Sequence, residues 1–106
     1  MLQHVVLFRF PAPLDEATER EMRDAVAAFP ERIGELTRLR FGADMTGGRT
    51  DGYGYLLFSE FPDEAALQRY RVHPVHKDFL AWLDERGATL LGFDYNLDDT
   101  TVLMPE

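Results

Sequence analysis

The sequence predicts a single α+β domain with the β-α-β-β-α-β order of a ferredoxin-like sandwich. Three observations support this fold class: four segments rich in β-forming residues, helical segments between them, and strands with apolar residues on both faces. The strands are expected at residues 2–10, 33–45, 53–61 and 90–97, and the helical segments at residues 15–29 and 63–86. The helices should cover one face of the sheet, which leaves a second apolar face exposed. We therefore expect a homodimer packed sheet to sheet.

The first strand and the first helix are bounded by recognisable end residues. Residues 2–10 (LQHVVLFRF) are rich in β-formers, and Pro11 ends this strand because proline has no backbone N–H to donate. Asp15 can cap a helix whose apolar stripe reaches Phe29 at spacings of three and four residues. Pro30 is expected to stop this helix.

The middle of the chain predicts two further strands joined by a loop. Residues 33–45 form the first of them, and Gly42 indicates a bulge or the end of that strand. The loop, residues 46–52 (TGGRTDG), is polar and rich in glycine. It lacks the spacing and the Gly-Lys-Ser/Thr ending of a phosphate-binding loop, and it precedes a strand. The sequence therefore does not predict a phosphate-binding loop here.

The second helical segment contains residues 70–79 (YRVHPVHKDF), which hold two of the three histidines. Pro74 disfavours helix at the preceding residue, so a helix capped by Asp63 should break near His73. Another helix can begin with Pro74 in its first turn, and Gly87 fits its C-terminal cap. Such a break presents polar side chains at a fixed angle, as segments that form functional sites often do.

Composition narrows the possible functions. The chain has 106 residues, 45% of them hydrophobic, which suits one core and leaves little room for a second domain. We assign residues 1–97 to the domain and residues 98–106 to a C-terminal tail that can dock on the partner subunit. No apolar run could span a bilayer and no signal peptide is recognisable, so we expect a cytoplasmic protein. The net charge of −8 opposes binding to nucleic acid or anionic membranes, and the lack of cysteine excludes disulfides and thiolate metal sites.

Four polar positions resemble the signature of a known family. His4 opens the first strand, and the later segment reads Tyr70-x-x-His73-Pro74-x-His76. With these residues, nearly the whole chain resembles the stress-responsive dimeric α/β-barrel (Dabb) domain. The resemblance implies a homodimer whose two sheets close into a barrel, with a pocket in each subunit between sheet and helices. Members of this family include small proteins of unknown role and a polyketide cyclase that closes the ring of olivetolic acid.

The resemblance also implies roles for three residues: His76 as the acid/base, Tyr70 as its assistant, and His4 as part of the pocket. A neutral imidazole can accept a proton at neutral pH, and a phenol can hold a carbonyl or enolate oxygen. The other candidates for substrate binding are the aromatic residues Phe8, Tyr55, Trp82 and Phe93. Such a pocket suits a small hydrophobic ligand that is planar or polyketide-like.

Two functional classes fit these residues. One is a cofactor-independent cyclase, isomerase or monooxygenase acting on an enolisable aromatic or polyketide-like substrate, and the other is a non-catalytic dimer that binds a hydrophobic small molecule. A structural interpretation is also open, in which His73 and His76 cap the helix break and Tyr70 belongs to the core. A metal site of these histidines with His4 is a further alternative, but no carboxylate is obviously placed to complete it. We therefore expect no metal and no cofactor.

Overall fold

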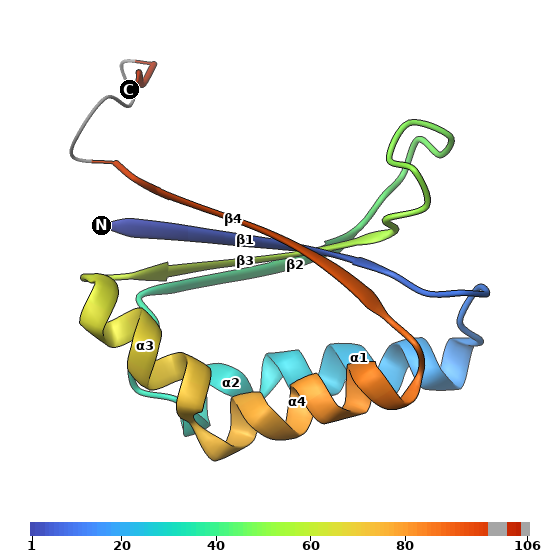
Figure 1. Ribbon diagram of the computed structural model, residues 1–106, viewed down its shortest axis with the longest axis horizontal. Helices are drawn as coiled ribbons and strands as arrows, with labels where there is room; N and C mark the ends of the chain where they lie inside the picture. Colours follow the sequence, from blue (N-terminus) through green and yellow to red (C-terminus); the bar gives the residue numbers. More distant parts are fainter. Residues whose placement is uncertain (98–101, 105–106) are drawn as a thin grey trace.

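The computed structural model describes residues 1–97 and 102–104. In this part of the chain, a four-stranded sheet forms one layer and the helices form a second layer on one of its faces (Figure 1). The elements in chain order are β1 (Leu2–Arg9), α1 (Glu16–Ala27), α2 (Phe29–Arg32), β2 (Arg38–Ala43), β3 (Tyr55–Phe61), α3 (Glu64–Val72), α4 (Pro74–Glu85) and β4 (Thr89–Asn96). This arrangement confirms the predicted α+β, ferredoxin-like fold.

The register of the antiparallel sheet decides which side chains reach the helix layer. The strand order is β2-β3-β1-β4, so β1 lies in the interior and β4 lies at an edge. His4 on β1 is paired with Ser59 on β3 and with Asp94 on β4. Paired residues point to the same face of a sheet, and His4 faces the Tyr70 ring of α3. Asp94 is therefore presented on the same side as the helices.

The predicted helix signals are confirmed. The Asp15 carboxylate accepts a hydrogen bond from the Thr18 N–H at the start of α1, and Asp63 does the same for the Ala66 N–H at the start of α3. The second helical segment breaks at His73, between α3 and α4. Pro74 occupies the first turn of α4, as expected for a residue that cannot donate.

The structure corrects the boundaries of three predicted elements. Pro30 does not simply end the first helix, because it lies in the first turn of the short helix α2. Residues 33–37 do not belong to a strand: Ile33 caps α2 and is fully buried beneath the helices, so its apolar character reflects the core and not a strand face. The third strand begins at Tyr55 and not at residue 53, because the preceding loop continues through Gly54.

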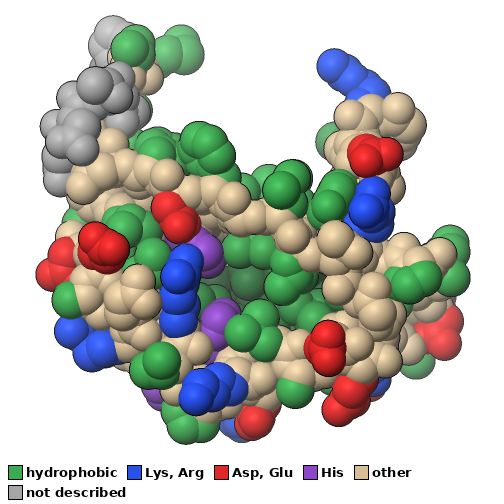
Figure 2. All heavy atoms as spheres, viewed as in Figure 1, with side chains coloured by type: hydrophobic (Ala, Val, Ile, Leu, Met, Phe, Trp, Pro, Cys, Tyr) green, Lys and Arg blue, Asp and Glu red, His purple; other side chains and the backbone are tan. Residues whose placement is uncertain are grey.

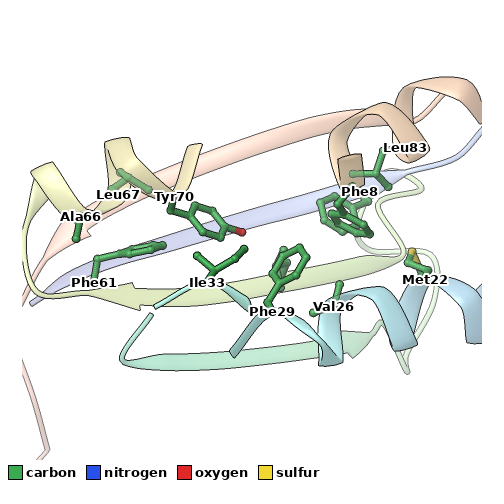
Figure 3. Packing of buried hydrophobic residues seen from close by; sticks show 12 residues of the cluster. Phe8, Met22, Val26, Phe29, Ile33, Phe61, Ala66, Leu67, Tyr70 and Leu83 are labelled. Atoms are coloured by element: carbon green, nitrogen blue, oxygen red, sulfur yellow. The ribbon is translucent and has the colours of Figure 1, made fainter. Parts of the chain in front are cut away.

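The core fills the space between the sheet and the helices (Figure 3). Its centre is aromatic, with the rings of Phe29 and Phe79 at a centroid distance of 5.5 Å and those of Phe8 and Phe79 at 6.0 Å. Phe61 and Tyr70 meet at 4.9 Å near the other end of the sheet. Aromatic pairs at these separations add to the stabilisation from burial. The core thus fixes α3 and α4 firmly against β1 and β3.

The opposite face of the sheet, called the outer face below, is not covered by helices (Figure 1). Its apolar residues are Val5, Leu7, Leu56, Phe58, Leu91, Phe93 and Tyr95. Phe93 is 67% exposed and Leu91 is 54% exposed in the single chain. Of the predicted tail, residues 98–101 and 105–106 lie outside the described residues, so its docking stays a prediction. No helix in the described ranges has the length and apolar character needed to cross a membrane.

Candidate functional site

A cavity of about 300 Å³ lies between the sheet and the helices α3 and α4. Figure 2 shows the hollow, in which hydrophobic side chains predominate and histidine side chains reach the wall. Most of the lining is apolar, and it includes Val6, Phe8, Leu57, Phe79, Leu80 and Leu83. The polar side chains in the wall are His4, Tyr70, Arg71 and His76. A mostly apolar cavity with a few polar groups is the usual form of a small-molecule site.

Tyr70 brings a fully buried hydroxyl to this wall. Its ring extends from α3 over the sheet with the oxygen pointing away from the helix backbone, as Figure 3 shows. Within the described residues, this oxygen has no hydrogen-bond partner. Burial raises the pKa of Tyr70, so the hydroxyl keeps its proton and can donate a hydrogen bond. An unpaired buried hydroxyl costs about 1–3 kcal/mol, so its presence here is not explained by stability.

The helix break fixes which nitrogen of His76 carries the proton. The His76 Nδ1 lies 3.2 Å from the carbonyl oxygen of Arg71, in the last turn of α3, where carbonyls lack helical partners. A carbonyl oxygen can only accept, so Nδ1 donates and the lone pair of the neutral ring is on Nε2. Burial lowers the pKa of His76 below its ordinary value of 6.5, and this effect outweighs the opposing effect of the Arg71 carbonyl. His76 is therefore a neutral base at neutral pH.

His76 also lies against Tyr70. The centroids of the two rings are 4.2 Å apart, with an angle of 42° between the ring planes. A buried proton donor and a buried proton acceptor thus occupy neighbouring positions on one apolar wall. This pair can hold a ligand oxygen and accept a proton from the same ligand.

Asp94 of β4 links two other polar groups of the site. One carboxylate oxygen forms a hydrogen bond with the His4 Nδ1, and the other lies 3.6 Å from the Arg71 Nη2. Since the carboxylate accepts from Nδ1, Nε2 of a neutral His4 is left with the lone pair. The side chains of Arg71 and Asp94 are 47% and 38% exposed, whereas His4 is buried. Arg71, which lines the cavity, is therefore partly in contact with solvent, and Asp94 lies beside it without lining the cavity.

Four of the residues predicted from the sequence meet at this cavity: His4, Phe8, Tyr70 and His76. Tyr70 and His76 come from helices on either side of the Pro74 break, and His4 and Phe8 come from the helix-facing side of β1. These segments are far apart in the chain and meet because β1 is an interior strand beneath the two helices (Figure 1).

The other three predicted residues do not line this cavity. The ring of Tyr55 stacks on that of Phe41, and its hydroxyl donates a hydrogen bond to the Glu19 carboxylate at 2.7 Å. Trp82 is directed toward α1, where its ring N–H donates to Glu21, because it lies to one side of the helical stripe that carries His76 and Phe79. Phe93 does not line the cavity either, since strand alternation places it on the outer face, opposite to its neighbour Asp94.

Neither Arg71 nor Asp94 was predicted from the sequence as a site residue. Asp94 is the single acidic residue in the apolar strand β4, and that isolation was an available signal. Its pairing with His4 depends on strand order and register, which no local pattern specifies. No sequence pattern singles out Arg71, because basic residues are common and favourable near the C-terminal end of a helix.

His73 has a structural role at the same break. Its Nδ1 accepts a hydrogen bond from the Val75 N–H at 3.1 Å and so caps α4. It is not among the residues that line the cavity. In the described ranges, no cluster of three or more His, Cys, Asp or Glu side chains is arranged to hold a metal ion.

Comparison with known families agrees with this architecture. The family model for the Stress responsive A/B Barrel Domain (Dabb) matches residues 2–97. The chain belongs to the Dabb family. The family resemblance noted in the sequence is thereby confirmed. No curated protein sequence matches the chain significantly.

Several solved structures share the fold of this Dabb chain. The protein At3g17210 from Arabidopsis thaliana is 23% identical with a TM-score of 0.81, and the match covers 98% of this chain and 100% of that one. A hydroxynitrile lyase from Passiflora edulis is 17% identical with a TM-score of 0.75, over 90% and 93% of the two chains. A protein from Jannaschia sp. CCS1, described as a dimeric ferredoxin-like protein of unknown function, is 26% identical with a TM-score of 0.65, over 87% and 96%.

Proposed function

We propose that this Dabb chain forms a homodimer in which each subunit binds a small hydrophobic molecule and transfers a proton through His76. The observation that carries the proposal is the unpaired Tyr70 hydroxyl, fully buried beside His76 in an apolar cavity. Buried polar groups normally have partners, and functional sites are where unpaired ones are tolerated. A carbonyl oxygen of a bound ligand supplies the missing acceptor.

The chemistry follows from the protonation states of the two groups. His76 Nε2 takes a proton from the carbon next to a ligand carbonyl, and the electron pair of the broken C–H bond moves onto the carbonyl oxygen. The Tyr70 hydroxyl donates a hydrogen bond to the resulting enolate oxygen. The protonated His76 then returns the proton to the carbon or to another atom of the product. An enolisable aromatic or polyketide-like compound meets these requirements.

The homodimer is supported by the outer face. Its exposed apolar residues, such as Leu91 and Phe93, form a contiguous patch across three strands. Patches of more than a few hundred Å² are rare on soluble monomers and usually mark interfaces. The Jannaschia relative, which is described as dimeric, has the same fold. The two subunits are thus expected to meet through their outer faces, away from the cavity.

The proposal is tested by hydrogen–deuterium exchange on an aryl ketone. Butyrophenone is incubated with the protein in deuterated buffer, and loss of its α-hydrogens is followed by NMR. The wild-type protein should accelerate the exchange, and His76→Ala should lower that acceleration about 10²–10⁴-fold with the fold intact. His73→Ala is the matched control, because it changes a histidine of the same segment that does not line the cavity.

Two results would count against catalysis. If His76→Ala exchanges the ketone as fast as the wild type, His76 is not the acid/base. If the ketone binds but does not exchange with either protein, the second candidate applies, in which the dimer is a non-catalytic carrier of hydrophobic small molecules. The apolar lining of the cavity supports binding in both cases.

A further inference from the structure

The arrangement of Arg71 at the cavity leaves it with unused hydrogen-bonding capacity. A guanidinium has five N–H donors in a planar fork that fits a carboxylate. In the described part of the chain, the side chain of Arg71 has one ionic contact, the 3.6 Å approach of Nη2 to Asp94. That distance is too long for a hydrogen bond of normal strength.

Arg69 lies two residues before Arg71 on the same helix and provides a comparison, because its guanidinium is bound by a carboxylate. Its Nε and Nη2 donate to the two carboxylate oxygens of Glu35 at 2.9 and 3.0 Å. Arg69 therefore has its planar fork satisfied, and it does not line the cavity. Arg71, in contrast, lines the cavity and its guanidinium is not bound in this way.

Asp94 cannot satisfy Arg71 because it is shared. Its Oδ1 is held by His4 Nδ1, which leaves Oδ2 for the distant contact with Arg71. A carboxylate held by a histidine on the neighbouring strand cannot turn both oxygens to the guanidinium. The geometry thus keeps the guanidinium at the cavity with room for a second acceptor.

Arg71 is also the only permanently charged side chain among the described residues that line the cavity. The remaining wall is apolar apart from two histidines and the Tyr70 hydroxyl. The positive charge of Arg71 acts on the cavity, since it contributes to lowering the pKa of His76. A ligand in this cavity therefore meets an apolar wall with a single cationic group at its margin.

We infer that the ligand of this cavity is an acidic amphiphile: an apolar body inside the cavity with a carboxylate held by the Arg71 guanidinium. This inference rests on the proposed function and specifies its substrate class. The carboxylate accepts hydrogen bonds from Nε and the Nη groups that Asp94 leaves free. The main-chain carbonyl of Arg71 still accepts from His76, so anion binding and the His76 tautomer depend on different atoms of one residue.

The experiment compares two probes of equal size, 4-propylbenzoate and 4-propylbenzamide, by isothermal titration calorimetry with the full chain. The wild type should bind the benzoate about tenfold more tightly than the benzamide, as expected for a charge-assisted contact at a partly exposed arginine. Arg71→Gln should remove that preference by weakening benzoate binding only, because the backbone carbonyl remains. Arg69→Gln is the matched control and should bind both probes as the wild type does.

A second variant guards against an indirect effect of Arg71→Gln on folding. Asp94→Asn removes the competing carboxylate and should strengthen benzoate binding several-fold, with little change for the benzamide. Equal affinities of the two probes for the wild type would overturn the acidic-ligand inference while leaving the proposed cavity function intact. An unchanged preference in Arg71→Gln would overturn it too. Binding of neither probe would overturn the inference together with the proposed function.

Discussion

Replacing Tyr70 with phenylalanine should make the protein more stable and less functional. The Tyr70 side chain is fully buried, and its oxygen has no partner among the described residues. The substitution removes only that oxygen and keeps the ring contacts with Phe61 and His76. An unpaired buried hydroxyl costs about 1–3 kcal/mol, so Tyr70→Phe should raise the free energy of unfolding by about 1–2 kcal/mol.

Tyr55→Phe provides the matched control on the same core. The Tyr55 hydroxyl donates to the Glu19 carboxylate at 2.7 Å, and burial together with this partner raises the pKa of Tyr55 to about 12. Removing a satisfied hydroxyl should lower the free energy of unfolding by about 0.5–1.5 kcal/mol. The two tyrosine variants are thus expected to change stability in opposite directions.

The assay is equilibrium unfolding in urea at one fixed protein concentration, because association would otherwise shift the apparent stability. Hydrogen–deuterium exchange of butyrophenone, measured with the same proteins, should be slower with Tyr70→Phe than with the wild type and unchanged with Tyr55→Phe. If Tyr70→Phe were less stable than the wild type by 1 kcal/mol or more, the hydroxyl would have a stabilising partner, and the reasoning from its unpaired state would be refuted.

Three further predictions follow from the helix break, the outer face and His76. His73→Ala should destabilise the protein by about 1 kcal/mol, because the α4 cap is lost. Its affinity for butyrophenone in calorimetry should equal that of the wild type. A loss of binding free energy as large as the loss of stability would give His73 a role in binding. Phe93→Glu should shift the protein to monomer in sedimentation velocity at micromolar concentration, whereas Ala17→Glu, at an exposed position of α1, should not; a monomeric wild type would contradict the outer-face interface. Because burial lowers the pKa of folded His76 from 6.5, the unfolded chain binds more protons below about that pH, so stability should decrease as pH falls through 6.5 and level off below the folded-state pKa. His76→Gln should lack this component in urea unfolding across the pH series, and the same slope in both proteins would argue against a buried neutral ring.

The fold and the helix break could be predicted from the sequence because local rules decide them. Pro74 breaks a helix whatever surrounds it, and Asp15 and Asp63 act as caps through side chains that reach only three residues ahead. The order of strands and helices then leaves few ways to cover the sheet. These features need no knowledge of which strands are neighbours.

Which residues form the site depends on the pairing register of the strands, so these residues could be predicted only in part. The alternation of β4 groups Leu91 with Phe93 correctly, but it does not tell which face meets the helices. That information comes from the pairing of His4 with Asp94, which also placed Asp94 in the site and Phe93 outside it. Trp82 was misplaced for a related reason, since a rotation of one residue around α4 turns a side chain from the cavity to α1.

The direct test of the account is the protonation state of the His76 ring, measured by long-range ¹H–¹⁵N NMR on protein labelled in its histidine rings. We expect a neutral ring at neutral pH with the proton on Nδ1, an unprotonated Nε2, and a titration midpoint below 6.5. Binding of an added aryl ketone should shift the resonance of the His76 Nε2. A ring that carries its proton on Nε2, or that is already protonated at neutral pH, would contradict the role of His76 as the base.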